Sequence, residues 1–279
     1  KMNDLIINPC EFHGVVRKLR SFFEERGFVE VHTQNRLSIL AACEDPSTIA
    51  TYNYAGSVWP LPQTGQMWLE YELLNNPTPQ GYYCVSTSYR NEPNPVEGRH
   101  NLIFPMFEFE SKGNFDDMLK LECDLVEYLG YGKSEEIPSE NYVDIANKYG
   151  VKELEHEHEN MIYKDYGSAF LLKNFPVYTS PFWNMKYNKT ANTSNKCDVI
   201  MSGQETIGSA ERSCDPEEMK HMFQTISNSM YSKTLYTLFG KKRVDNEMES
   251  FLKYDFFPRF GGGIGITRLI KSMKMENLL

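Results

Sequence analysis

The stretch of this sequence that most restricts the possible folds is FPMFEFE, residues 104–110. Side chains alternate between the two faces of a β-strand, so this order puts Phe107 and Phe109 on one face. The other face receives a mixed set: Phe104, Met106, Glu108 and Glu110. We therefore predict a strand of a sheet, with one face in an aromatic core and the other carrying carboxylates.

A second strand is predicted just before it, in GYYCVSTSYRNE, residues 81–92. Arg90 and Glu92 are two positions apart and therefore share one face of that strand. Pro and Gly interrupt the segment between the strands, which predicts a loop and hence a hairpin. On spacing alone, a hairpin with ordinary salt bridges explains these charges as well as a binding site does.

Helices and strands mix along the chain without a regular βαβ rhythm. Apolar residues recur at helical spacing over residues 12–23, and Gly27 separates this helix from the strand FVEVHT. A turn and helix follow in WPLPQTGQMWLEYELLNN, and an amphipathic helix in FDDMLKLECDLVEYLG. This order predicts an α+β fold, an antiparallel β-sheet flanked by helices. We expect one domain over residues 1–279, with residues 134–174 as a helical, charged insertion within it.

Composition restricts the class of protein. The 279 residues are 41% hydrophobic, without an apolar run long enough for a membrane span, and the N-terminus lacks the pattern of a secretory signal. Six cysteines without a CxxC pair fit reduced thiols, and we expect a cytoplasmic protein. The net charge of -9 argues against a broad nucleic-acid footprint.

Two further patches carry chemistry. CDVIMSGQETIGSAERS predicts a strand, a turn and a strand that bear Asp198, Glu205 and Arg212. Two carboxylates across a turn can converge on magnesium, which prefers oxygen ligands. FGGGIGITRL has four glycines, the last of them Gly265, before a helix predicted to start near Thr267. Glycine-rich turns and helix starts present free N–H groups, so phosphate is the ligand we expect there.

In order and spacing, these patches resemble the motifs of class II aminoacyl-tRNA synthetases, and most of all the catalytic domain of the aspartyl/asparaginyl branch. FFEERGFVEVHTQ resembles motif 1, the dimer-forming helix and strand, which implies a homodimer. YRNE…RHNLIF…FEFE resembles motif 2, and GGGIGITRL resembles motif 3. The similarity extends from about residue 10 to residue 275 and implies the class II catalytic fold.

The resemblance implies a nucleotide site for ATP with Mg²⁺. Arg90 would bind the α-phosphate and the amino-acid carboxylate, and Phe104 would stack on adenine opposite Arg268. Arg90 and Arg268 would be catalytic, and Asp198 and Glu205 would hold the metal. The remaining implied ATP-binding residues are Glu92, Arg99, His100, Glu205 and Gly265.

The amino-acid pocket follows from the same resemblance. Gln66 would contact the bound substrate, Glu44 would hold the α-ammonium, and Arg212 would meet the side-chain carboxyl or carboxamide. Leu69 stands where aspartyl enzymes carry a lysine. The leucine at this position and the sequence TGQMWLE around it, which is closer to that of asparaginyl enzymes, indicate an asparaginyl-type pocket.

The reaction implied is adenylation, in which a carboxylate attacks the α-phosphorus of ATP and pyrophosphate leaves. Because the chain starts almost directly at motif 1, without an anticodon-binding barrel, we expect no specific capture of tRNA. The function we favour is asparagine synthetase, which uses aspartate, ATP and ammonia and releases AMP and pyrophosphate. The alternatives are a stand-alone asparaginyl- or aspartyl-tRNA synthetase and a non-catalytic binding or regulatory subunit.

Overall fold

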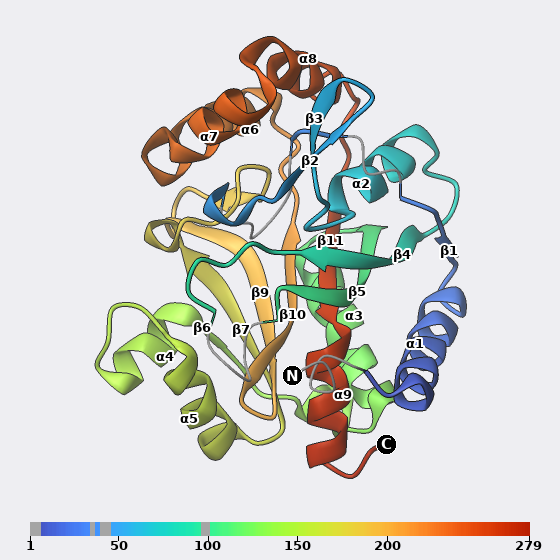
Figure 1. Ribbon diagram of the computed structural model, residues 1–279. Helices are drawn as coiled ribbons and strands as arrows, with labels where there is room; N and C mark the ends of the chain where they lie inside the picture. Colours follow the sequence, from blue (N-terminus) through green and yellow to red (C-terminus); the bar gives the residue numbers. More distant parts are fainter. Residues whose placement is uncertain (1–6, 34–36, 40–45, 96–100) are drawn as a thin grey trace.

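A nine-stranded sheet forms the centre of the computed structural model, which describes residues 7–33, 37–39, 46–95 and 101–279 (Figure 1). Eight strands follow one another in the order β1-β4-β5-β11-β10-β9-β7-β6, and β8 pairs with β9. The strands, in sheet order, are β1 (Phe28–Glu30), β4 (Gly81–Tyr89), β5 (Ile103–Lys112), β11 (Arg259–Gly265), β10 (Gln204–Glu211), β9 (Thr193–Met201), β7 (Ala169–Pro176), β6 (Ser139–Asn141) and β8 (Tyr187–Asn188). Only the end pairs β1–β4 and β6–β7 are parallel among these described strands. The predicted α+β fold with a mostly antiparallel sheet is confirmed.

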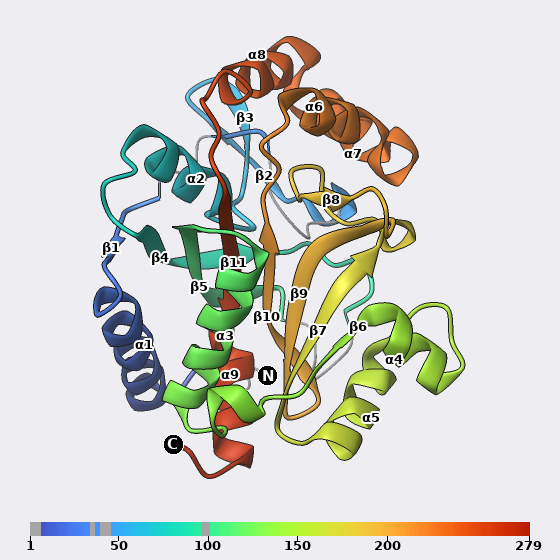
Figure 2. The same ribbon diagram turned by 180° about the vertical axis from the view of Figure 1, so that it is seen from behind.

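Three helices pack on one face of this sheet. They are α1 (Pro9–Glu24), α3 (Phe115–Leu129) and α9 (Ile266–Met275), and Figure 2 shows α3 and α9 in front of the sheet with α1 beside them. The Asn8 side chain caps the start of α1 by accepting from two backbone N–H groups. A left-handed Gly130 ends α3. These local signals fix the helix ends, and burial of their apolar faces supplies most of the stability.

The predicted alternation along β5 is confirmed. Phe107 and Phe109 are buried in the core beneath α1, where their rings lie 5.1 and 4.9 Å from the ring of Phe23. The ring of Tyr83 on β4 stacks on Phe107 with centroids 4.9 Å apart. One face of β5 is therefore fully occupied by aromatic packing, and the opposite face is left for polar side chains.

A second core lies at the other end of the sheet, around the fully buried Trp183. The elements near it are α2 (Gln66–Asn75), α6 (Pro216–Thr225), α7 (Met230–Phe239), α8 (Lys241–Phe251) and the hairpin of β2 (Thr51–Tyr54) and β3 (Ser57–Pro60). Short 3-10 turns connect elements at η2 (Pro46–Thr48), η3 (Ser134–Glu136), η4 (Val177–Thr179) and η5 (Ile226–Ser229). In Figure 1, α2, α6, α7, α8 and the β2–β3 hairpin lie above the main sheet, so they border one end of its open face.

The segment 134–174 differs from its prediction as a helical insertion. It does contain two helices, α4 (Tyr142–Tyr149) and α5 (His156–Tyr166). Its remaining part supplies β6 and most of β7, which are strands of the main sheet. The apolar run Ala169–Leu172 is buried against β9, because a strand covered on both faces carries a continuous apolar run and not an alternating one.

Within the part of the chain that the structure describes, none of the helices combines the length and the apolar character needed to cross a membrane.

Candidate active site

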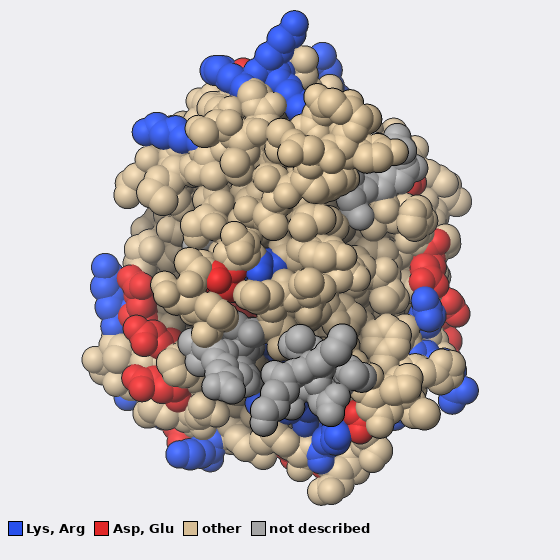
Figure 3. Space-filling view, viewed as in Figure 1, with Lys and Arg blue, Asp and Glu red and all other residues tan. Residues whose placement is uncertain are grey.

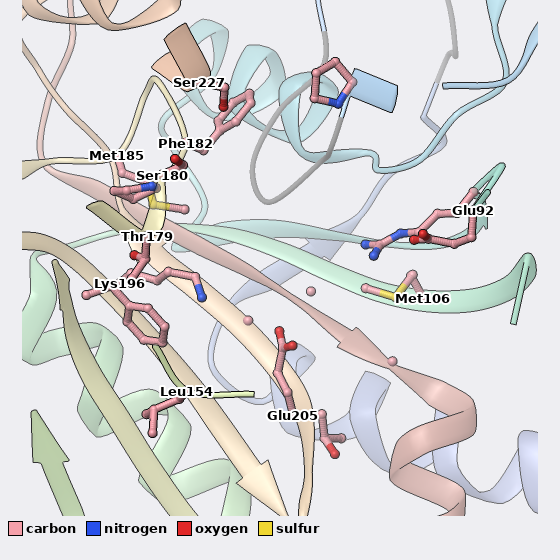
Figure 4. Close-up of a pocket in the computed structure, with 18 of the residues that line it drawn as sticks. Glu92, Met106, Leu154, Thr179, Ser180, Phe182, Met185, Lys196, Glu205 and Ser227 are labelled. Carbon is pink, nitrogen blue, oxygen red and sulfur yellow. The ribbon is translucent and has the colours of Figure 1, made fainter. Parts of the chain in front are cut away.

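A pocket of about 700 Å³ opens on the sheet face opposite α3 and α9. Figure 3 shows it as a hollow with an acidic and a basic side chain inside, and Figure 4 shows its lining residues. It gathers six of the residues predicted to bind ATP: Arg90, Glu92, Phe104, Glu205, Gly265 and Arg268. Three other predicted residues, Glu44, Arg99 and His100, lie outside the described residues.

The open end of the β4–β5 hairpin holds the first arginine. The Arg90 N–H donates to the carbonyl of Leu102 at 2.8 Å, so the two chains stay paired one residue beyond the last strand residue, Tyr89. The Arg90 guanidinium lies 5.5 Å from the centre of the Phe104 ring. An aromatic face and a cation are thus held together on one wall of the pocket.

The second arginine reaches the pocket from the first turn of α9. Arg268 donates from Nη1 to the Glu205 carbonyl oxygen at 2.8 Å, and the Glu205 carboxylate lies 3.8 Å from the same nitrogen. Gly265, the residue before α9, faces the Arg268 side chain. The structure therefore brings Arg90 and Arg268 into one pocket although 178 positions separate them in the chain.

The two acids predicted to hold magnesium lie over the same glycine. A Cβ built on Gly208 would be 3.1 Å from Glu205 Oε1 and 3.6 Å from Asp198 Oδ1. Burial raises the pKa of Asp198 to about 7, although the neighbouring Lys196 opposes the shift. Both carboxylates therefore lie beside Gly208 at the β9–β10 hairpin, and their role in metal binding stays a prediction.

Lys196 changes what this pair of acids can bind. Its Nζ donates to both carboxylate oxygens of Asp198, each at 2.6 Å. Because this ammonium already compensates the charge of Asp198, the carboxylate is a poor ligand for a second cation in this arrangement. Over the described residues, no group of three or more His, Cys, Asp or Glu side chains is placed to hold a metal. The sequence analysis missed Lys196, although its position two residues before Asp198 puts both side chains on one strand face.

A narrow extension of about 80 Å³ leads from the pocket toward β11. It shares Arg90 and Glu205 with the main pocket, and Gln66 and Arg212 line it, as predicted for the amino-acid site. Leu69 also lines it and is fully buried. The arginine is only 1% exposed, so it forms the floor of the extension and does not project into it.

The floor is a buried network of two acids and two arginines. Arg212 donates from Nε to Glu110 at 3.1 Å and lies 3.8 Å from Glu70. Arg259 donates to Glu70 from two nitrogens, at 3.0 and 2.8 Å. Burial raises the pKa of Glu110 to about 7, against the lowering effect of Arg212. The charge of Arg212 is therefore already balanced from within the protein.

Glu108 is a further lining residue that the sequence analysis placed on the correct face without giving it a role. Its carboxylate accepts hydrogen bonds from the Gly65 N–H at 2.8 Å, from the Ser86 hydroxyl at 2.5 Å and from the Thr64 hydroxyl. It is 3% exposed and borders the extension. The alternation along β5 was the signal that could have identified it.

The glycine run serves the sheet as well as the pocket. Gly261, Gly262 and Gly263 belong to β11, and a Cβ on Gly261 would collide with the Glu110 carboxylate. A Cβ on Gly262 would lie 2.8 Å from the Cβ of Ser209 on β10. Phosphate was the ligand expected for this run, yet at these two positions the close neighbours are side-chain and backbone atoms of the adjacent strands. Gly263 and Gly265 line the main pocket.

Comparison with known proteins agrees with this geometry. An aspartate–tRNA(Asp/Asn) ligase of Archaeoglobus fulgidus is 22% identical over 94% of this chain and 63% of its own length. A cytoplasmic aspartate–tRNA ligase of Arabidopsis thaliana is 20% identical over 90% of this chain and 51% of its own length. The chain thus spans between half and two thirds of the length of these relatives.

Solved structures share the fold. The asparaginyl-tRNA synthetase of Pyrococcus horikoshii, complexed with asparaginyl-adenylate, superposes with a TM-score of 0.77 at 18% identity, covering 94% of this chain and 64% of that one. The enzyme of Entamoeba histolytica, also with asparaginyl-adenylate, gives a TM-score of 0.74 at 17% identity, covering 96% and 63%. The family model described as tRNA synthetases class II (D, K and N) matches residues 11–277. The chain therefore belongs to the class II tRNA synthetase family (D, K and N).

Proposed function

We propose that this chain activates an amino acid with ATP, forming an aminoacyl adenylate and pyrophosphate. The observation that carries the proposal is the convergence of Arg90, Phe104 and Arg268 on one pocket of about 700 Å³. These residues come from the end of β4, from β5 and from α9. A packed core has no need for two arginines in one open pocket, whereas a bound polyphosphate requires several cations.

The chemistry needs alignment more than proton transfer. An amino-acid carboxylate is ionised at neutral pH and attacks the α-phosphorus without a general base, while pyrophosphate leaves. Negative charge builds up on the phosphoryl oxygens, and the Arg90 and Arg268 guanidiniums would stabilise it. Phe104 would orient the adenine by stacking on it, and the pocket would keep the carboxylate in line with the leaving group.

The charges beneath the extension bear on which amino acid binds. The floor pairs the buried acids Glu70 and Glu110 with the buried arginines Arg212 and Arg259, and a third buried acid, Glu108, borders the extension. A free side-chain carboxylate would need a net positive floor, and this floor does not supply one. Two groups without net charge match it better. One is the carboxamide of asparagine, and the other is the zwitterionic α-amino acid end of an aspartate.

The second of these orientations leads to the finer proposal, asparagine synthetase. Aspartate bound by its zwitterionic end would present its β-carboxylate to ATP, and attack on the α-phosphorus would release pyrophosphate. Ammonia would then attack the β-carbonyl of the adenylate, AMP would leave, and loss of a proton from nitrogen would give asparagine. The net charge of -9 supports a small acceptor over a long polyanion.

The first orientation supports a second candidate, an asparaginyl-tRNA synthetase. Asparagine would bind with its carboxamide over Arg212, and its α-carboxylate would be activated. The tRNA ligase activity named for the curated relatives favours this reading.

Both candidates would act as homodimers through α1 and β1, since β1 is an edge strand and its Val29 is 47% exposed. Sedimentation of the purified protein tests the dimer.

Pyrophosphate exchange tests activation itself. The protein is incubated with labelled pyrophosphate, ATP and either aspartate or asparagine, and we expect exchange with one of them. Arg90→Ala should reduce exchange by at least about a hundredfold, because one preorganised donor to a charged transition state is removed. Lys120→Ala is the control, since Lys120 is an exposed cation on α3, on the opposite face of the sheet from the pocket. Absence of exchange with both amino acids would contradict the proposal and favour a non-catalytic subunit.

Trapping with hydroxylamine separates the two candidates. Asparagine synthetase predicts the β-hydroxamate of aspartate, and free asparagine when ammonia replaces hydroxylamine. Asparaginyl-tRNA synthetase predicts the α-hydroxamate of asparagine, and charged tRNA when tRNA is supplied. An α-hydroxamate of aspartate would contradict the argument from the floor charges.

A further inference from the structure

Lys196 is a cation inside the pocket that no part of the proposed reaction has used. It extends from β9 into the space that also receives Glu205, and Figure 4 shows the two side chains facing that space. Its side chain is 13% exposed, and that of its partner Asp198 is 10% exposed. Both distances from Nζ to the Asp198 oxygens are 2.6 Å, so the ammonium bridges the carboxylate symmetrically.

The surrounding residues hold the lysine in this position. Its ammonium lies 3.7 Å from the centre of the Phe175 ring, within the range of a cation–π contact. The pairing of β7 with β9 shifts register around Asn174, whose φ of 59° is left-handed. This irregularity follows Lys173 and precedes Phe175, so it sets which face of β7 the ring occupies. The ammonium is therefore fixed between a carboxylate and an aromatic ring.

Three acids disfavour phosphate at this corner of the pocket: Glu205 lines it, and Asp198 and Glu159 lie close by. Asp198 and Glu205 lie over Gly208, and Glu159 from α5 accepts a hydrogen bond from the Glu205 N–H at 2.9 Å. Each of these acids would repel a polyphosphate in a partly buried site. A divalent ion bridging Asp198 and Glu205 would remove the repulsion, but Lys196 already occupies both oxygens of Asp198.

We propose that the Lys196 ammonium takes the place of a divalent cation on Asp198, so that the chain binds the phosphates of ATP with little dependence on magnesium. The proposal rests on the nucleotide site proposed above and names a residue that sets the charge within it. The ammonium neutralises Asp198, so the phosphates meet Arg90 and Arg268 without an uncompensated carboxylate at this position. A lysine is a compact point charge, as the ion that it replaces would be.

Nucleotide binding with and without metal tests this role. The dissociation constant of ATP is measured by calorimetry in excess magnesium and in excess EDTA. For the wild type, we expect a difference of less than about threefold. Lys196→Met keeps the apolar stem against Phe175 and removes the charge, so ATP affinity in EDTA should fall by at least about tenfold. Added magnesium should restore it, because Asp198 becomes free to bind the ion.

The control is the same substitution on the neighbouring strand. Lys173→Met changes a half-buried lysine outside the pocket whose ammonium donates to the Ser139 hydroxyl, and it should leave both dissociation constants unchanged. Manganese binding, followed by the loss of the free-ion EPR signal, gives a second readout. The Lys196→Met protein should bind manganese more tightly than the wild type. The double variant K196M/D198N should lose this gain, because the uncovered carboxylate is gone.

Three results would contradict the proposed role of Lys196. Equal dependence on magnesium in the wild type and Lys196→Met would overturn the proposal while leaving the nucleotide site intact. A Lys196→Met defect that magnesium does not restore would also overturn it, and would assign the lysine to structure alone. Absence of ATP binding by the folded wild type under both conditions would refute the nucleotide site itself, and the proposal with it.

Discussion

Glu122 is a buried carboxyl whose contribution to the free energy of unfolding can be tested through its pH dependence. It lies on α3, 1% exposed, and accepts a hydrogen bond from the hydroxyl of Ser209 on β10. Among the residues that the structure describes, no cation contributes to its electrostatic environment, and burial raises the pKa of its carboxyl from 4.5 to about 8. At neutral pH the folded protein therefore holds this group in its protonated form. We expect Glu122→Gln to change how stability depends on pH.

The sign follows from where the proton binds. Between pH 4.5 and about 8 the folded state keeps the Glu122 proton, while the unfolded chain has lost it. The contribution of this group is therefore fully present below pH 4.5 and is lost as pH rises toward 8. At about 1.4 kcal/mol per pKa unit, the whole loss is on the order of 5 kcal/mol. Glutamine cannot ionise, so the variant lacks this slope.

Urea denaturation at a series of pH values between 5 and 9 measures the effect. Glutamine leaves a buried N–H group to satisfy, which costs roughly 1 to 3 kcal/mol at every pH. The prediction therefore concerns how the free energy of unfolding changes with pH, and not its value at any one pH. The free energy of unfolding of Glu122→Gln, relative to wild type, should rise by several kcal/mol across the range. Glu127→Gln, on the exposed side of the same helix, is the control and should keep the wild-type slope. Identical slopes for Glu122→Gln and wild type would refute the reasoning.

Three further substitutions test the floor and the nucleotide wall. Arg259→Met removes the two-nitrogen partner of buried Glu70, so the free energy of unfolding should fall by roughly 3 to 5 kcal/mol in urea denaturation. An unchanged midpoint would contradict the ion-pair assignment. Gly261→Ala forces a methyl group against the Glu110 carboxylate, which should cost roughly 1 to 3 kcal/mol and lower the melting temperature. Phe104→Ala should weaken ATP binding about tenfold in calorimetry by removing a stacking surface, with little change in amino-acid affinity. Equal loss of both affinities would argue against adenine stacking.

The β4–β5 hairpin shows what could be predicted from the sequence. Period-two alternation is a local property of the chain, and it assigned Phe107 and Phe109 to the core and Glu108 and Glu110 to the opposite face. Helix ends were also predictable where capping residues are local, as at Gly130. The motif order then predicted that Arg90 and Arg268 meet, which no local pattern could have done.

The segment 134–174 shows where local patterns fail. Its charged residues and helical spacing describe α4 and α5 correctly, but they do not reveal that β6 and β7 extend the main sheet. Strand order is a property of distant pairings, and β7 lies beside β9, where Leu172 pairs with Asp198, 26 positions later in the chain. An apolar run of four residues is compatible with a buried helix or a buried strand until its partner is known.

The charged residues of the pocket show a further limit of prediction from sequence. Residue type alone does not determine whether a charged side chain is available to bind a ligand. Arg212 and Asp198 were both predicted as ligand-binding groups from their positions in one motif. In the fold, Arg212 is balanced by Glu110, which reaches it because Gly261 has no side chain, and Asp198 is balanced by Lys196 on its own strand. Sheet geometry fixes both pairs. Glu110 on β5 reaches Arg212, at the end of β10, across the intervening strand β11, whereas Lys196 and Asp198 lie on the same strand. The pocket therefore presents to a substrate only the charges that the sheet leaves uncompensated, and on this basis Arg90 and Arg268 are the groups through which phosphate would be recognised.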